Sequence, residues 1–511
     1  MSHGTVRVRF APAPTGMMHL GNIRTALMNA LYAKRHNGTF VLRIEDTDAD
    51  RNYDPKAIQI SEDLQWLGLH YQEGPIIGGP HAPYFQSERT KLYQEKLIEL
   101  DDSGKIYRCF CTEQELERKR ERQRALKLPP RYDRTCLHKS QEEIKTLLAK
   151  NTPFVWRLNI DQSRIVTIHD LAGKSFTYAM RPSIDQSYIV TIHDLARKSV
   201  TFDMQHFSDF PLTRQDGSFT FLFANCVDDI DMEITHVFRG EEHLSNTACQ
   251  AALYEAFGKP LPVFWHMPLL CNPDGKKLSK RDFGFSLRDL REAGFLPQAI
   301  LNYLAIIGGS YQNEIMDFGE LVKSVNLDDL HATGKITYDV DKFQWVNRKW
   351  IEKLSPEALF DVCLPYLAPL LHERQHPLPQ PVRTQLISAL QVIKPELNTL
   401  DKCAGLLDYL FFAPTDVKTK ALTCMNESEL KAAAPALAPH LDLFEKPDTI
   451  TDALKKIAAD AKVPLKHIYW FIRLAITGRN TGASMHELIA IVGVDEAKKR
   501  VQQLVAKLDS I

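Results

Sequence analysis

Two polar clusters, far apart in the chain, have residue types that suit the chemistry of nucleotide phosphates. His19 begins a helical pattern directly after the loop at residues 11–16, and the sequence KLSKR follows much later, at residues 277–281. An imidazole at a helix N-terminus can donate to a phosphate oxygen, and the free N–H groups there favour negative charge. Lysines on a polar loop neutralise more of that charge. Together the clusters predict a site that stabilises adenylate formation from ATP.

The elements around the first cluster form a strand–loop–helix–strand unit. Residues 6–10 alternate like a strand, and apolar residues at helical spacing follow from Leu20. A second strand is predicted at residues 40–44, with Glu45 directly after it. Ligands bind at the carboxyl ends of such strands, so we expect Glu45 to lie at a ligand-binding edge of the sheet. The G-x-G-x-x-G pattern typical of a dinucleotide site is missing from the first turn.

Each motif alone is common, but the combination closely resembles the class I aminoacyl-tRNA synthetases, and among them the bacterial-type glutamyl-tRNA synthetases. The resemblance spans nearly the whole chain and is carried by residues 9–16, 19–21, 43–48, 78–80, 86–89, 227–229, 238–243, 266–270, 277–281, 296–304 and 473–478. It implies an α/β fold: a Rossmann-type class I synthetase catalytic domain with an inserted α+β acceptor-binding domain and an all-helical C-terminal anticodon-binding region. After about residue 330 the pattern is indeed mostly helical, whereas the related glutaminyl branch carries β-barrels there.

The resemblance also implies domain boundaries. We expect the first half of the Rossmann domain at residues 1–108, the acceptor-binding insertion at 109–222, the second Rossmann half at 223–275, a lysine-loop and stem-contact domain at 276–350, and helical anticodon-binding domains at 351–511.

The activity implied is ATP-dependent ligation of L-glutamate to the 3′ terminal adenosine of glutamate tRNA, through a glutamyl-adenylate. The residues expected to bind glutamate are Arg9, Ala11, Ala13, Glu45, Phe221, Asn225 and Arg239. Those expected to bind ATP, with its Mg²⁺, are His19, Gly21, Glu242, His243, Lys277, Ser279 and Lys280. His19, Lys277 and Lys280 would be catalytic. The two arginines suit carboxylates because a guanidinium binds a carboxylate in a bidentate manner.

Three positions depart from the family pattern. Ala13 stands where many relatives carry a serine, and Phe221 where many carry a tyrosine; Asn22 replaces the second histidine of the general class I signature. The first two changes remove hydroxyls near the expected glutamate carboxylates. We therefore expect weaker glutamate affinity, with no replacement that favours glutamine.

Four further residues have the types of metal ligands. Cys109, Cys111, Cys136 and His138 would make a closed tetrahedral zinc site, but the spacing alone fits four unligated side chains equally well. Some members of the resembling family carry a zinc knob with this pattern, which favours a structural zinc ion.

An internal repeat interrupts the resemblance. Residues 160–172 recur with few changes as residues 184–196, and two copies are too few for a solenoid. We expect a local duplication that adds a hairpin to the acceptor-binding domain. His169 and His193 are expected to be solvated or hydrogen-bonded strand residues and not metal ligands.

Composition limits the remaining possibilities. A formal net charge of -1 means that any tRNA surface is a local patch, and the 9 cysteines without regular spacing indicate a reducing compartment. No signal segment or membrane-spanning run is apparent, so we expect a cytoplasmic protein, and a monomer.

An ungapped alignment places Glu396 where strictly discriminating relatives can carry an arginine, which predicts that glutamine tRNA is also charged. The alternatives are a small-molecule adenylyltransferase, a catalytically inactive tRNA-binding paralogue and a truncated glutamyl-queuosine-type enzyme.

Overall fold

The computed structural model describes residues 5–47, 52–128, 130–160, 165–167, 175–177, 189–194, 198–203, 207–279, 281–326, 335–371 and 380–509. The chain forms two compact units: unit 1 comprises Met1–Leu290 with Pro297–Val340, and unit 2 comprises Arg291–Leu296 with Asp341–Ile511.

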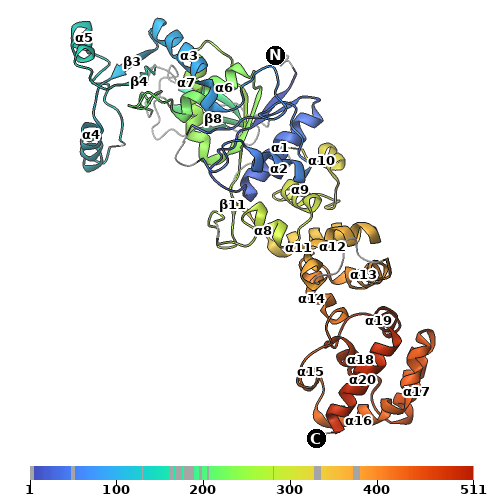
Figure 1. The fold of residues 1–511 in the computed structure, drawn as a ribbon. Coiled ribbons are helices and arrows are strands. Elements are labelled where there is room, and N and C mark those ends of the chain that lie inside the picture. The colour runs from blue at the N-terminus through green and yellow to red at the C-terminus, as the bar shows by residue number, and fades with distance from the viewer. Residues whose placement is uncertain are drawn as a thin grey trace. The chain divides into compact units, whose positions relative to one another are not determined.

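Unit 1, coloured mostly from blue to yellow in Figure 1, is built on an eight-stranded sheet that begins at one edge with the parallel strands β2-β1-β9-β10. These strands are β1 (Arg7–Phe10), β2 (Thr39–Leu42), β9 (His236–Gly240) and β10 (Val263–Met267). They are buried and largely apolar, as parallel strands covered by helices must be. Helix α1 (Leu20–Arg35) connects β1 to β2 and packs on β1, β2 and β9. The predicted α/β catalytic fold is confirmed.

The motifs at residues 227–229 and 238–243 lie in the second half of the catalytic domain, on or beside two helices. α6 (Phe221–Asp231) precedes β9 in the chain and α7 (Leu244–Ala256) follows it, and the two helices pack against each other. The single turn η5 (Glu241–His243) joins β9 to α7. α2 (Ile58–Leu67), η2 (Gln86–Arg89) and α3 (Thr90–Asp102) precede the insertion.

The inserted region contains its own antiparallel pair, β3 (Ile106–Cys109) and β4 (Val155–Leu158), in which Cys109 pairs with Val155. Between the two strands lie α4 (Glu113–Ala125) and α5 (Gln141–Ala149), each begun by a reciprocal capping box. No residue of α4 is buried, and its Arg120 and Arg124 pair with Glu117. This agrees with the solvated charged helix that the sequence favours here.

The duplicated segment forms β5 (Ile165–Thr167), β6 (Ser175–Thr177), β7 (Ile189–Asp194) and β8 (Lys198–Asp203). β7 and β8 make the expected hairpin, but β7 also pairs with β10 at Asp194 and Phe264, so the hairpin extends the catalytic sheet. The repeat pattern could not predict the pairing with β10, because strand pairing is non-local. The assignment of the hairpin to the acceptor-binding domain stays a prediction. His169 lies outside the described residues, and His193 is part of β7.

The last part of unit 1 follows β10. It consists of β11 (Leu270–Cys271), α8 (Leu287–Glu292), α9 (Pro297–Ile306), α10 (Phe318–Ser324) and β12 (Ile336–Thr337), which pairs with β11. The lysine-rich loop joins β11 to α8, and α9 packs against α1. The part of unit 1 that follows the loop is therefore packed against α1.

Unit 2 contains only helical elements among its described residues, which confirms the predicted helical C-terminal half. They are α11 (Val340–Glu352), α12 (Pro356–Leu371), α13 (Gln380–Ile393), η7 (Lys394–Glu396), α14 (Lys402–Leu407), η8 (Asp408–Leu410), α15 (Val417–Cys424), α16 (Glu427–Leu437), η9 (Ala438–Glu445), η10 (Pro447–Thr449), α17 (Ile450–Asp460), α18 (Leu465–Thr477), α19 (Met485–Val492) and α20 (Val494–Asp509). Among the described residues of the whole chain, no helix has the length and apolar character needed to cross a bilayer.

Candidate active site

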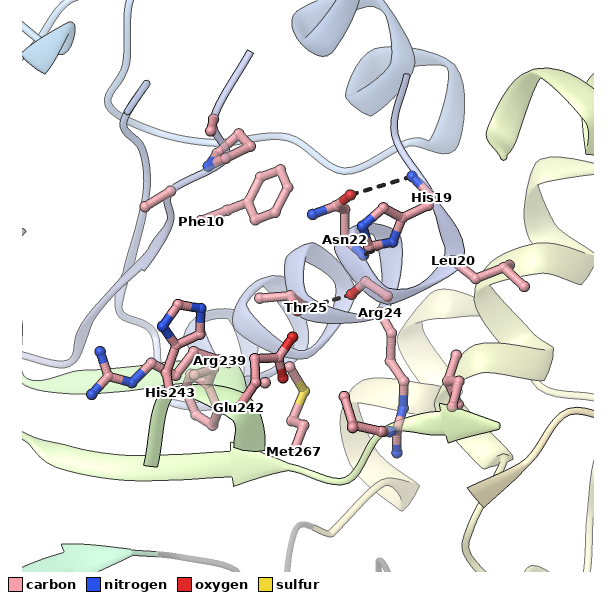
Figure 2. A pocket seen from close by; sticks show the side chains of 18 of the residues that line it. Phe10, His19, Leu20, Asn22, Arg24, Thr25, Arg239, Glu242, His243 and Met267 are labelled. Carbon is pink, nitrogen blue, oxygen red and sulfur yellow. Dashed lines mark hydrogen bonds between the residues drawn. The ribbon is translucent and has the colours of Figure 1, made fainter. Parts of the chain in front are cut away.

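A cavity of about 450 Å³ lies at the carboxyl ends of β1, β2 and β9, beside the N-terminus of α1. It brings together twelve of the predicted glutamate and ATP residues: Arg9, Ala11, Ala13, His19, Gly21, Glu45, Phe221, Asn225, Arg239, Glu242, His243 and Lys277. Figure 2 shows His19 and Asn22 on one side of this pocket and Arg239, Glu242 and His243 on the other. Ser279 does not line it and instead hydrogen-bonds Asp282, and Lys280 lies outside the described residues.

His19 is the N-cap of α1 and is held in a reciprocal pair with Asn22. The Asn22 backbone N–H donates to His19 Nδ1 at 3.3 Å, and the His19 N–H donates to Asn22 Oδ1 at 3.3 Å. Because Nδ1 accepts, the ring proton of the neutral imidazole sits on Nε2 and is free to donate to a ligand. Burial, and then the charge of Lys277, lowers the pKa of His19, which keeps it neutral. Asn22 thus has a structural role where the general signature has a second histidine.

The region after the lysine-rich loop is tied to the loop that precedes α1. The Leu20 N–H donates to the Phe285 carbonyl at 3.1 Å, and the Leu287 N–H donates to the Met18 carbonyl at 2.8 Å. The Phe285 ring also stacks on the His19 ring, with 5.3 Å between centroids. The two motifs, 258 residues apart when counted from His19 to Lys277, are therefore neighbours in the fold.

Glu45 lies in a buried charge network at the other end of the pocket. Asn225 Nδ2 and Arg43 Nη2 both donate to Glu45 Oε1, the latter at 3.2 Å. Arg43 Nη1 also donates to Asp229 Oδ1 at 2.6 Å, and Arg9 Nε donates to the same oxygen at 3.1 Å. Burial raises the pKa of Glu45, and Arg43 opposes the effect. The network holds Glu45 and Arg9 in place before any substrate binds.

Arg239 is buried in the same pocket without a carboxylate partner. Among the described residues its hydrogen-bond acceptors are the Thr247 hydroxyl and, at 3.4 Å, His266 Nε2. Burial, together with the charge of Arg9, lowers the pKa of Arg239 to about 9. Asp229 and Glu45 oppose this effect from beyond ion-pair distance, so the described residues leave the guanidinium able to pair with an anionic ligand.

The cavity has two apolar side chains, Phe221 and Ala13, at positions where the family resemblance leads us to expect hydroxyls. Phe221, at the start of α6, places its ring 5.6 Å from that of His243, and Ala13 lines the cavity opposite the sheet. Burial, and then Arg239, lowers the pKa of His243 to about 4, so this ring is neutral. Charge in this part of the pocket is therefore concentrated on the guanidinium groups.

Several residues that shape the site were not assigned a role from the sequence: Arg43, Asp229, Thr247, His266 and Phe285. A partial signal was present, because Thr247 follows His243 by four residues and so lies one helical turn further on the same face. Arg43 and Asp229 stood inside recognised motifs, but their partners are distant in the sequence.

Three of the four predicted metal ligands lie together in the insertion. The Sγ atoms of Cys109, Cys111 and Cys136 are within 4.8 Å of one another, and those of Cys111 and Cys136 are 3.6 Å apart. Such separations fit the edges of a tetrahedron with Zn–S bonds of about 2.3 Å. The Tyr132 hydroxyl lies 3.2 Å from Cys109 Sγ, whereas His138 is exposed and is not part of the cluster. The three thiols therefore fit a metal ion, and the fourth predicted ligand is not in place.

Comparison with known families agrees with this fold and pocket. A family model described as "tRNA synthetases class I (E and Q), catalytic domain" matches residues 5–178 and 170–345, and one described as "Anticodon binding domain" matches residues 347–505. The first match is split inside the duplicated region, as expected if one part of the family pattern is present twice. The fold is that of a class I aminoacyl-tRNA synthetase.

Full-length relatives narrow the class. The chain is 36% identical to a glutamate–tRNA ligase of Anaeromyxobacter dehalogenans over 98% of both chains, and 34% identical to one of Natranaerobius thermophilus over 99% of both. A crystal structure of a glutamate tRNA ligase from Elizabethkingia meningosepticum, in complex with its amino acid, superposes with a TM-score of 0.83 at 30% identity, covering 99% of this chain and 100% of that one. The chain belongs to the glutamate–tRNA ligase family.

Proposed function

We propose that the pocket activates L-glutamate with ATP and passes it to the 3′ terminal adenosine of glutamate tRNA. The observation that carries the proposal is Arg239, a buried guanidinium of the pocket whose hydrogen-bond partners among the described residues are a hydroxyl and an imidazole. It suits a dicarboxylic amino acid, whose side chain supplies the missing negative charge. Full-length similarity to glutamate–tRNA ligases supports the same substrate.

In the first step, an oxygen of the substrate α-carboxylate attacks the α-phosphorus of ATP. The bond to the β-phosphate oxygen breaks, and pyrophosphate leaves with the negative charge. His19 donates its Nε2 proton in a hydrogen bond to a phosphate oxygen, and Lys277 supplies a positive charge. Mg²⁺ accompanies ATP and neutralises phosphate charge. Lys280 is assigned the same role as Lys277 from its position in the motif.

The amino acid is held by groups that are already in place. Arg9 and Arg239 bind its carboxylates, while Glu45 accepts a hydrogen bond from its ammonium group and Asn225 fixes Glu45. In the second step, a ribose hydroxyl of the tRNA attacks the acyl carbon of the adenylate, and AMP leaves. Energetically, each step depends on positioning and charge stabilisation more than on covalent chemistry by the protein.

Aminoacylation of purified glutamate tRNA with labelled glutamate tests this function. We expect charging that needs ATP and tRNA and that is lost in Arg239→Gln. Activation of glutamate with a product that never reaches tRNA would favour the small-molecule adenylyltransferase, and tRNA binding without activation would favour an inactive paralogue.

We also propose one structural zinc ion on Cys109, Cys111 and Cys136. The mutual distances of the three sulfur atoms support it, and Tyr132 offers an oxygen ligand beside two of them, at 3.2 and 3.7 Å. His138, the ligand expected from the family pattern, would have to move to take the fourth position. A site with four protein ligands has no open position and is structural.

The choice of tRNA is expected to depend on η7 in the anticodon-binding region. Glu396 is exposed in η7, and the Lys394 ammonium donates to the Leu354 carbonyl at 2.6 Å, so it is already engaged. A carboxylate cannot make the bidentate donor contacts that an arginine makes to a base. We therefore propose that the enzyme charges glutamine tRNA as well. A preference of several hundredfold for glutamate tRNA would contradict this.

A cytoplasmic monomer completes the proposal. The proposed location follows from the substrates, because tRNA and ATP are both present in the cytoplasm. Light scattering of the purified protein at micromolar concentration, with and without tRNA, tests the oligomeric state.

A further inference from the structure

Arg239 is enclosed by three uncharged groups from two elements. On the sheet, Arg239 of β9 and His266 of β10 are directly paired across the strands, and Phe264 lies two residues earlier on the same face of β10. The Arg239 guanidinium carbon lies 5.2 Å from the centre of the Phe264 ring. From α7, Thr247 closes the other side, and Thr247 and His266 are both completely buried.

The hydrogen bonds around Arg239 define the state of its neighbours. Arg239 donates through Nη2 to the Thr247 hydroxyl and through Nε, at 3.4 Å, to His266 Nε2. Since Nε2 accepts, the His266 ring is neutral with its proton on Nδ1. The Thr247 hydroxyl donates to the His243 carbonyl at 3.2 Å and lies 2.7 Å from the same Nε2. Both neighbours therefore accept from Arg239 and bring no charge.

Among the described residues, the buried Arg24 donates only to the carbonyls of Pro268 and Ile307, both at 3.4 Å, whereas three other buried arginines of unit 1 pair with carboxylates. Arg43 and Arg9 share Asp229, at 2.6 and 3.1 Å, and Arg89 pairs with Asp228 at 2.7 Å. Their charges are compensated by the protein. Within the described residues, Arg239 has no carboxylate within ion-pair distance, so its charge stays available. The contrast shows that the fold can place a carboxylate beside a buried arginine, and that it places neutral acceptors beside this one.

We propose that Thr247 and His266 are positioning residues that hold Arg239 uncompensated and aimed into the pocket, and that this pair determines the choice of glutamate over glutamine. The inference rests on the proposed binding of a glutamate carboxylate by Arg239. An uncompensated guanidinium gains far more from a carboxylate than from an amide, because the carboxylate both accepts two hydrogen bonds and neutralises the charge. If either neighbour carried a negative charge, that difference would shrink.

The first test removes one acceptor at constant shape. Thr247→Val takes away the hydroxyl, and Thr247→Ser keeps it. We expect Thr247→Val to raise the KM for glutamate in aminoacylation about tenfold or more, since a buried donor is left without a partner, and Thr247→Ser to stay within about threefold of the wild type. The KM for ATP should not change in either. His266→Leu and His266→Gln form a second pair, because the glutamine oxygen can replace Nε2 as the acceptor.

The second test adds a charge at constant size. Thr247→Asp places a carboxylate beside Arg239, whereas Thr247→Asn has nearly the same volume and no charge. We expect the aspartate variant to have a KM for glutamate at least about tenfold above that of the asparagine variant, and a smaller ratio of glutamate to glutamine activation. A purely structural role for residue 247 would affect the two variants equally.

Arg239→Gln separates this inference from the proposed function. If Arg239→Gln leaves the KM for glutamate unchanged, the carboxylate assignment is wrong and the inference is wrong with it. Arg239→Gln could instead raise that KM strongly while the KM for glutamate is the same in Thr247→Val as in Thr247→Ser, and the same in Thr247→Asp as in Thr247→Asn. In that case the proposed function stands and the positioning role is refuted. Circular dichroism and thermal unfolding of each variant confirm that folded proteins are compared.

Discussion

Lys277 Nζ lies 3.3 Å from Glu242 Oε1, so the lysine proposed to meet the phosphates of ATP is paired with a carboxylate of the same pocket. Both side chains are partly exposed, at 61% and 43%, and such a pair is worth little in free energy. Phosphate can therefore displace Glu242 at small cost. The pair places the lysine beside His19, whose pKa its charge helps to lower.

The first prediction concerns this lysine. Lys277→Ala removes a charge that stabilises the departing pyrophosphate, so we expect kcat for aminoacylation to fall about 10²-fold with tRNA affinity nearly unchanged. Lys276→Ala, at the exposed neighbouring position, is the matched control and should keep full activity. Lys280→Ala should resemble Lys277→Ala. Charging at the wild-type rate by either loop variant would show that the motif is not catalytic here.

The second prediction uses the buried histidine of the pocket. The pKa of His243 is about 4 in the folded protein and 6.5 in the unfolded chain, so the unfolded state binds the proton first as the pH falls. The stability that this group contributes is present above pH 6.5 and is lost progressively between pH 6.5 and 4. His243→Asn removes the effect, and urea unfolding should show a shallower loss of stability in that interval than for the wild type. Parallel pH profiles would contradict the assignment.

The third prediction concerns zinc. Protein purified without chelator should contain about one zinc per chain, and Cys109→Ser with Cys136→Ser should lose both the metal and the stability of the insertion. Tyr132→Phe and His138→Ala distinguish the fourth ligand. We expect weaker metal retention in Tyr132→Phe and little change in His138→Ala, because only Tyr132 lies beside the sulfur atoms. The reverse result would restore the ligand set expected from the sequence.

The fourth prediction concerns the duplication. Residues 165–167 of β5 and 189–191 of β7 pair with the same residues, 201–203 of β8. One copy is therefore enough to complete the pairing, and deletion of residues 161–184 should leave a folded enzyme with near-native glutamate activation. Phe202→Pro is the contrasting variant, since it removes an N–H from the strand that both copies use, and it should lower stability. Insoluble deletion protein would show that both copies are required.

The sequence by itself determined the local parts of this protein. His19 caps α1 because the helix begins at Leu20 and because Asn22, in its first turn, forms reciprocal hydrogen bonds with His19. Glu45 lines the pocket because it follows a strand of the sheet. The helical second half was equally readable from periodicity. Each of these depends on residues a few positions apart, where spacing alone sets geometry.

The tertiary structure alone decided how charges are matched. Asp229 compensates Arg9 and Arg43 from far along the chain, whereas Arg239 meets neutral Thr247 and His266. The edge at which the duplicated hairpin joins the sheet and the exposure of His138 were likewise set by packing. Burial raises the free-energy cost of a charge and increases the stabilisation that a partner provides. Burial depends on contacts between segments far apart in the chain, and no local sequence pattern predicts these contacts.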